Sequence, residues 1–162
     1  MVSSYQSSDL DNNNLTLALR QKVISQLSFL TRQWNGANKR HSLQQITDLE
    51  RAYSWLFEYA KTLGIDAPML SKNAAELDSQ YAYDKWDPLF AVGESLLGEL
   101  AAYWRMVKDF ENQATSAVNA YHKLFDLLWS QGFRGDMFPD AELPQELMPS
   151  YYIDYWRSKG SL

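Results

Sequence analysis

The sequence lacks cysteine entirely. Disulfide bridges, cysteine-bound zinc, iron–sulfur clusters and thiol catalysis are therefore excluded together. Glycine and proline are also scarce, with seven and five residues in a chain of 162. Because these two residues interrupt helices and strands, their scarcity favours long secondary-structure elements.

Long apolar runs are absent as well. No stretch approaches the ~18 consecutive apolar residues that a membrane-spanning helix needs. The first residues, MVSSYQSSDLDNNN, show neither the basic start nor the apolar run of a secretory signal. We therefore expect a soluble, cytoplasmic protein without membrane insertion.

Basic charge is in deficit, since the formal net charge is −5. A nucleic-acid-binding domain is expected to carry a basic face, and the basic stretch from Arg32 to His41 is a small footprint. We therefore expect no nucleic-acid partner. Acidic residues gather near the C-terminus, where Asp140, Glu142 and Glu146 favour a cationic or polar partner.

Apolar and aromatic residues are abundant, at 46% and 14% of the chain. A domain of this size buries roughly 68–70% of its unfolded surface and needs no disulfide or metal to hold it. We expect the polar residues 1–13 to be flexible and residues 14–162 to form a single helical domain.

Apolar residues recur at steps of three and four over 14–35 and again over 42–63, which predicts two amphipathic helices. Ser42 and Gln45 have the spacing of a capping box, and Gly64 is placed to end the second helix. A shorter helix is expected within residues 66–86. Asp87 followed by Pro88 then predicts a further helix start.

The apolar stripe that follows keeps its phase from Leu89 to Leu128. It predicts one very long helix over about 88–131. This helix is either continuous or kinked, or it is broken into two near 112–116, and we favour the continuous or kinked form. In an unbroken helix Glu111 would lie on the apolar stripe, where a carboxylate needs a partner. A break would leave it in water.

The segment after this helix is irregular and contains three prolines, and a short helix is expected around 150–158. No strand-like alternation occurs. The fold class is therefore all-α: a bundle of four to five helices, with an irregular, proline-containing C-terminal segment packed on it.

No catalytic or cofactor-binding constellation is visible. The residue three before His122 is Asn119, so the Glu-x-x-His pairs of di-metal bundles are missing. His122 and Asp126 lie four apart, as an oriented general base requires, but no nucleophile is indicated beside them, and a surface pair is favoured. We expect no metal and no cofactor, and we favour a protein that is not an enzyme.

Aromatic side chains are in surplus at two places. Trp55 falls on the polar side of its helix with Tyr59 one turn further on, and something should cover them. The C-terminal helix would place four aromatic residues on one arc: Tyr151, Tyr152, Tyr155 and Trp156. Either this arc covers Trp55, Tyr59 or Trp86 within the chain, or it binds another protein.

These patterns favour a non-enzymatic protein–protein interaction module, such as an adaptor, assembly chaperone, immunity or regulatory factor. Tyr, Trp and Arg dominate binding hot spots. A partner protein, or a second copy of the chain, is expected on these residues: Trp55, Tyr59, Tyr152, Tyr155, Trp156, Asp140, Glu142 and Glu146. The alternative is a small-molecule or pigment-binding bundle. Its pocket would be lined by Tyr103, Trp104, Glu111, Tyr121, His122 and Trp129.

Overall fold

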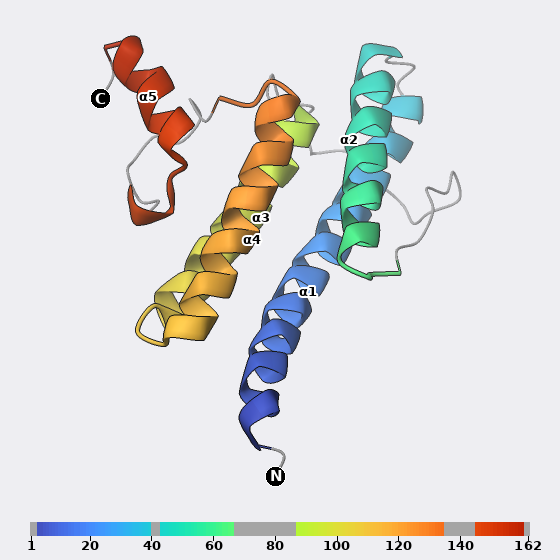
Figure 1. The fold of residues 1–162 in the computed structure, drawn as a ribbon. Helices are drawn as coiled ribbons and strands as arrows, with labels where there is room; N and C mark the ends of the chain where they lie inside the picture. The colour runs from blue at the N-terminus through green and yellow to red at the C-terminus, as the bar shows by residue number, and fades with distance from the viewer. Residues whose placement is uncertain (1–2, 40–42, 67–86, 135–144, 161–162) are drawn as a thin grey trace. The chain divides into compact units, whose positions relative to one another are not determined.

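The computed structural model describes residues 3–39, 43–66, 87–134 and 145–160. Within these ranges the ordered elements are helices and there is no strand, which confirms the all-α fold class (Figure 1). The elements are α1 (Ser3–Lys39), α2 (Leu43–Thr62), α3 (Pro88–Val107), α4 (Glu111–Ser130), a 3₁₀ turn η1 (Gln145–Leu147) and α5 (Ser150–Ser158). The helix predicted within 66–86 falls almost wholly outside the described residues.

The chain divides into two compact units. We call residues 16–96 the middle unit and residues 1–15 together with 97–162 the terminal unit. Helix α1 begins at Ser3, ahead of the predicted start near residue 14. The flexible N-terminus and the single domain from residue 14 stay predictions.

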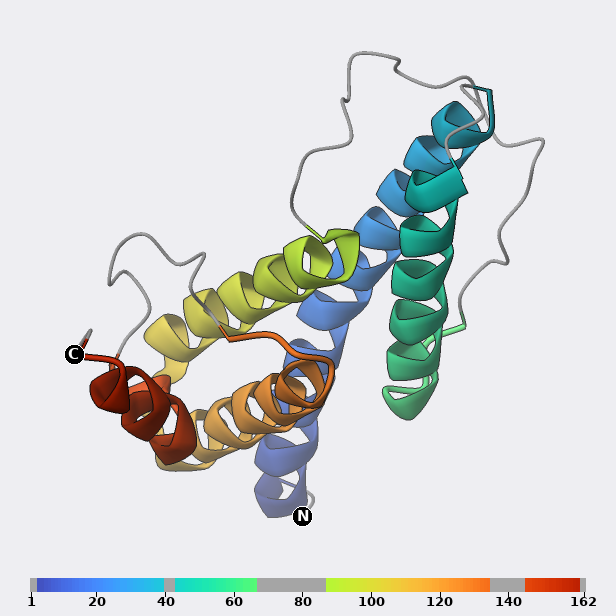
Figure 2. The same cartoon turned by 90° about the horizontal axis from the view of Figure 1, so that it is seen from above.

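In the middle unit, α1 and α2 run side by side in opposite directions (Figures 1 and 2). The predicted stripe of the first helix is buried throughout: Leu19, Val23, Leu27, Leu30 and Trp34. The indole Nε1 of Trp34 donates to Oε2 of Glu50 at 2.9 Å, which links the two helices with a polar contact. From α2 the core receives Leu49, Ala52, Tyr53, Leu56, Tyr59 and Ala60.

Helix α1 runs through Gly36 to Lys39, so the predicted end at residue 35 is wrong. Gly36 is buried, as are its neighbours Trp34 and Asn35. A glycine inside a helix costs only about 1 kcal/mol relative to alanine. Tertiary packing around this turn outweighs that cost, and the glycine does not end the helix.

Helix α2 ends as predicted at Gly64, which has a φ of 73°. The amide of Ile65 donates to the carbonyl of Ala60 at 2.9 Å, and the amide of Gly64 donates to the carbonyl of Lys61 at 3.0 Å. This pair of bonds is a Schellman motif, in which glycine takes the left-handed position without steric cost. Ser42, the predicted cap of this helix, lies outside the described residues.

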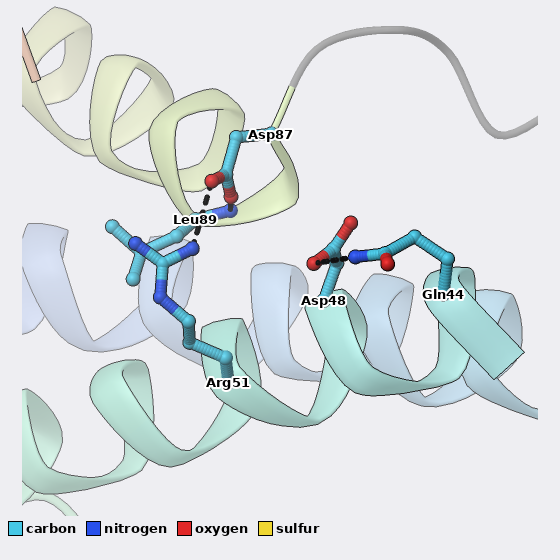
Figure 3. Close-up of polar contacts among 5 residues, drawn as sticks. All are labelled: Gln44, Asp48, Arg51, Asp87 and Leu89. Atoms are coloured by element: carbon cyan, nitrogen blue, oxygen red, sulfur yellow. Dashed lines mark hydrogen bonds and ion pairs between the residues drawn. The ribbon is translucent and has the colours of Figure 1, made fainter.

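Helix α3 begins as Asp87 and Pro88 predicted. One carboxylate oxygen of Asp87 accepts from the backbone amide of Leu89 at 2.9 Å, which caps the helix. The other oxygen lies 2.7 Å from the guanidinium of Arg51 on α2. Figure 3 shows Asp87 between the first turn of α3 and the side chain of Arg51, with Gln44 and Asp48 paired along α2 nearby.

The stretch predicted as one long helix is two helices, α3 and α4, with the break at 108–110 and not at 112–116. The amide of Phe110 donates to the carbonyl of Val107 at 2.9 Å to close the turn. The apolar spacing continues across this turn, so periodicity alone did not reveal it. Glu111 is the first residue of α4 and is exposed, where its charge stabilises the helix N-terminus.

Within the terminal unit, residues 97–107 of α3 lie antiparallel to α4 (Figure 2). Helix α3 contributes these buried side chains: Leu97, Leu100, Ala101, Tyr103 and Val107. Helix α4 contributes Ala117, Tyr121, Leu124, Phe125 and Leu128. Phe110, at the turn, is 60% exposed and does not join this core.

Candidate functional site: the C-terminal aromatic cluster

Helix α5 lies against α4 through aromatic rings. The ring centroids of Trp129 and Tyr151 are 4.9 Å apart, and those of Phe125 and Tyr152 are 5.4 Å apart. Tyr155 meets Trp129 edge-on at 5.5 Å. The C-terminal aromatic cluster, as we call it, comprises Phe125, Trp129, Phe133, Tyr151, Tyr152, Tyr155 and Trp156. The predicted aromatic arc therefore faces the chain's own α4.

Two polar side chains of α4 hold the C-terminal segment beside these rings. His122 Nε2 lies 2.9 Å from the carbonyl oxygen of Leu147. Because a carbonyl only accepts, this nitrogen carries the proton and donates it. The hydroxyl of Tyr151 donates to Oδ1 of Asp126. His122 and Asp126 thus anchor the C-terminal segment, an arrangement different from a carboxylate orienting a general base.

The hydroxyl of Tyr151 remains protonated over a wide pH range. Burial raises its pKa, and the hydrogen bond to Asp126 and the charge of that carboxylate raise it further. The neutral hydroxyl is the form that donates the hydrogen bond. The Tyr151–Asp126 contact is therefore strongest below the normal tyrosine pKa of about 10.

A glycine turn after α4 completes the receiving surface. Gly132 has a φ of 99°, and the amide of Phe133 donates to the carbonyl of Leu128 at 3.1 Å. This Schellman turn directs Phe133 inward, where it is 1% exposed and meets Phe125 edge-on at 5.7 Å. It also brings the next residue, Arg134, back over the end of α4.

Arg134 joins the end of α4 to α5. Its guanidinium carbon lies 4.0 Å from the ring centroid of Trp129 and 5.6 Å from that of Tyr155. One of its nitrogens donates to the carbonyls of Trp129 and Phe133, at 3.0 and 2.9 Å. The backbone carbonyl of Arg134 in turn accepts from the indole of Trp156 at 2.6 Å. The contacts with the two rings and the hydrogen bonds thus fix the position and orientation of the guanidinium.

The two sides of this contact differ in burial. On the receiving side, Phe125 and Phe133 are at 0% and 1% exposure. On the α5 side no residue is fully buried, and all four aromatic side chains of the arc are half-buried. Helix α5 therefore covers the aromatic face of α4 while keeping part of its own aromatic surface accessible.

The predicted aromatic pair on α2 belongs to the other unit. Trp55 and Tyr59 stack on each other with centroids 5.7 Å apart and an interplanar angle of 7°. Tyr59 is buried, and burial raises its pKa to about 12. Trp55 is half-buried. The ring contacts of the C-terminal arc are with Phe125 and Trp129, and Trp86 lies outside the described residues.

The remaining predicted residues differ in burial. Glu146 is exposed on η1, while Asp140 and Glu142 lie outside the described residues. Among the residues of the alternative pocket, Tyr103 is buried, Trp104 is half-buried and Glu111 is exposed. His122 and Trp129 instead contact the C-terminal segment. The exposed Glu111 does not line a pocket with the others.

Tyr121 is the unusual residue of that alternative set. Its side chain is at 0% exposure, and its hydroxyl has no hydrogen-bond partner. Burial raises its pKa, Tyr152 adds to the increase and Arg105 opposes it. A buried hydroxyl without a partner costs about 1–3 kcal/mol of stability.

The sequence pattern does not indicate that Phe133 and Arg134 belong to this site, because they lie in a segment that is expected to be irregular. The available signal was Gly132 directly after the last apolar residues of a helix, which predicts a Schellman turn and a buried residue just beyond it. No pattern in the sequence indicated that Asp126 would pair with Tyr151.

In the described parts of the chain, no three or more His, Asp or Glu side chains gather as a metal site would require. None of the described helices combines the length and apolar character needed to cross a bilayer. Comparison with protein-family models, curated proteins and solved structures yields no significant match.

Proposed function

We propose that this chain is a non-enzymatic protein–protein interaction module whose binding surface is the C-terminal aromatic cluster. One observation carries the proposal: the aromatic arc of α5 is fixed on α4, yet none of its four side chains is fully buried. A helix that only covered the core would bury its largest side chains. This one presents them in a defined arrangement.

The composition of the surface supports this proposal. Tyr, Trp and Arg are the residues that most often contribute large binding energies at interfaces. Here two cations lie near the ring of Tyr155, with Arg134 at 5.6 Å and Lys159 at 5.4 Å from its centroid. Because these side chains are already held in place, this surface would lose less conformational entropy when a partner binds.

The rim around the aromatic cluster carries both charges. Asp154, Arg157 and Lys159 are exposed on or just beyond α5, and Glu146 is exposed on η1. A polar rim around an aromatic centre is the usual composition of a specific interface. Participation of Asp140 and Glu142 in this rim is part of the proposal.

The roles of His122 and Asp126 support a non-enzymatic function. His122 is the one histidine among the residues that the structure describes, and its Nε2 donates to the carbonyl of Leu147. Asp126 accepts from Tyr151. Both polar groups are engaged in holding the C-terminal segment, which is a structural task.

Affinity capture from native cell extract tests the proposal. The tagged full chain is compared with Trp156→Asp and with Glu58→Gln, a control at an exposed position of α2. We expect a stoichiometric partner that Trp156→Asp loses and Glu58→Gln keeps. Because α5 has no fully buried residue, the melting temperature should fall by only a few degrees. A partner captured equally by all three proteins would refute the proposed surface.

A small-molecule-binding function is the second candidate, and the buried hydroxyl of Tyr121 is the observation that favours it. A ligand with a polar atom would satisfy that hydroxyl. Native mass spectrometry of the purified chain should then show added ligand mass that Tyr121→Phe loses. If no ligand binds, Tyr121→Phe should leave stability unchanged or raise it by about 1 kcal/mol, because an unpartnered hydroxyl is removed.

A further inference from the structure

Arg134 is a charged side chain within the C-terminal aromatic cluster. Its guanidinium carbon lies 4.0 Å from the ring centroid of Trp129 and 5.6 Å from that of Tyr155. Its Nη1 donates to the carbonyls of Trp129 and Phe133, so this nitrogen is engaged by the chain itself. These contacts orient the guanidinium before any partner binds.

The other edge of the same guanidinium is unused. Nε and Nη2 carry the remaining N–H groups, and neither atom donates a hydrogen bond within the residues that the structure describes. Neither atom is enclosed without a partner, and the side chain as a whole is half-buried. These N–H groups are therefore open to solvent. Nε and Nη2 form an edge through which arginine can bind a carboxylate with two parallel hydrogen bonds.

The charge of Arg134 has no acidic partner in the described part of the chain. The carbonyls at the end of α4 carry only partial negative charge. Lys159 places a second cation 5.4 Å from the ring centroid of Tyr155, and among the described residues it too forms no ion pair. Two cations near one half-buried ring, without a carboxylate to neutralise them, attract an anion to this place.

The charges around the cluster favour an anion with a single negative charge. Asp126 holds Tyr151, whose ring centroid lies 4.9 Å from that of Trp129, and Asp154 is exposed on α5. A phosphate group carries a charge of about −1.5 to −2 at neutral pH. The two aspartates therefore repel a phosphate more strongly than they repel a carboxylate, and an acidic side chain is the better match.

We propose that the partner of the C-terminal aromatic cluster places an aspartate or glutamate carboxylate on the Nε and Nη2 edge of Arg134. This inference rests on the proposed function, because it names the chemistry of the partner of the same surface. Since the guanidinium is already oriented, forming the two hydrogen bonds restricts little further side-chain motion. Lys159 adds a longer-range attraction, and the half-buried rings of Tyr155 and Trp156 contact apolar side chains beside the acidic residue.

A random peptide library displayed on phage supplies the probe. The full-length chain and full-length Arg134→Gln are the two baits, and counter-selection against Trp156→Asp retains the peptides that need the aromatic cluster. We expect the peptides selected on the wild type to be enriched in Asp or Glu beside apolar residues. On Arg134→Gln this acidic enrichment should disappear. Retained peptides without an acidic preference on the wild type would overturn the inference.

A double-mutant cycle on one selected peptide separates recognition of the carboxylate from a structural effect of the substitution. Dissociation constants are measured for the wild type and Arg134→Gln, each with the acidic peptide and with the same peptide carrying an amide in place of the carboxylate. Each single change should weaken binding about tenfold, and both together should weaken it no further than one alone. If the two losses multiply instead, Arg134 only supports α5 and the inference is wrong.

Arg157→Gln is the matched control, because it removes the same charge from an exposed residue of α5. It should weaken binding less than about twofold, equally for the acidic and the amide peptide. The same coupling at Arg157 as at Arg134 would overturn the assigned edge. Replacing the acidic residue of the peptide by phosphoserine should weaken binding, and tighter binding would overturn the choice of a carboxylate.

The outcomes separate this inference from the proposed function. If peptides that depend on Trp156 carry no acidic residue, the surface binds a partner of different chemistry and only the inference fails. If no selected peptide depends on Trp156, the surface itself is wrong. Circular dichroism of each variant establishes that its helices are retained before these results are compared.

Discussion

Removing the hydroxyl of Tyr151 should weaken the docking of α5 on α4, because the hydrogen bond to Asp126 is lost. A hydrogen bond to a charged group contributes about 1.5–3 kcal/mol when buried, and exposed charged pairs contribute about 0.2–1 kcal/mol. Tyr151 is half-buried and Asp126 is exposed, so we expect about 1 kcal/mol. That free energy corresponds to an increase of about fivefold in the opening equilibrium of α5.

A double-mutant cycle measures this coupling. The proteins are wild type, Tyr151→Phe, Asp126→Ala and the double variant, and the readout is hydrogen exchange of the amides of α5. Each single variant should lose the same interaction, so the double variant should open no more easily than either. If the free-energy losses of the two single variants simply add in the double variant, Tyr151 and Asp126 do not act as a pair. That result would refute their contact as an anchor of the C-terminal segment.

The same pair predicts a dependence on alkaline pH. The folded-state pKa of Tyr151 is raised, so its contribution to docking is fully present below pH 10 and is lost as the pH rises through the folded pKa. Asp126→Ala removes one cause of the raised pKa. In that variant, hydrogen exchange of α5 should depend less steeply on pH above 10.

Three further predictions concern stability. An added methyl group meets no atom within 4 Å at Gly98 or at Gly64, but Gly64 has a φ of 73°. Gly98→Ala should therefore raise the free energy of unfolding by about 0.5–1 kcal/mol and Gly64→Ala should lower it by about 1 kcal/mol, as urea denaturation will show. Asp87→Ala should cost about 1–2 kcal/mol in the same assay and Arg51→Ala less than about 1, because only Asp87 caps a helix. The pKa of Tyr59 is about 12, so thermal denaturation should show stability falling as pH rises from about 10 to 12, and Tyr59→Phe should remove that part of the loss.

The sequence predicted well those features that follow from short-range rules. The buried stripe from Leu19 to Trp34 followed from helical spacing, because each apolar residue on it faces the core. Gly64 and Asp87 were identified by conformational and capping preferences that act within a few residues. These elements needed no knowledge of distant contacts.

The features that the sequence predicted poorly depend on tertiary contacts. The break at 108–110 contains neither glycine nor proline, and the apolar spacing continues from Val107 into α4. Gly36 stays helical because its surroundings are buried. The aromatic arc of α5 was predicted as an arc, but its contact with Phe125 and Trp129 depends on how the chain returns after Gly132.

Site-specific photo-cross-linking tests the proposed interaction surface most directly. A photoreactive residue is placed at Arg157, which is exposed on α5, and separately at Glu58, which is exposed on α2, in the full chain within native cell extract. We predict a cross-linked protein from position 157 and none from position 58, and a product of twice the chain's mass would identify the partner as a second copy. No product from position 157, or equal products from both positions, would contradict the assignment of the C-terminal aromatic cluster as the binding surface.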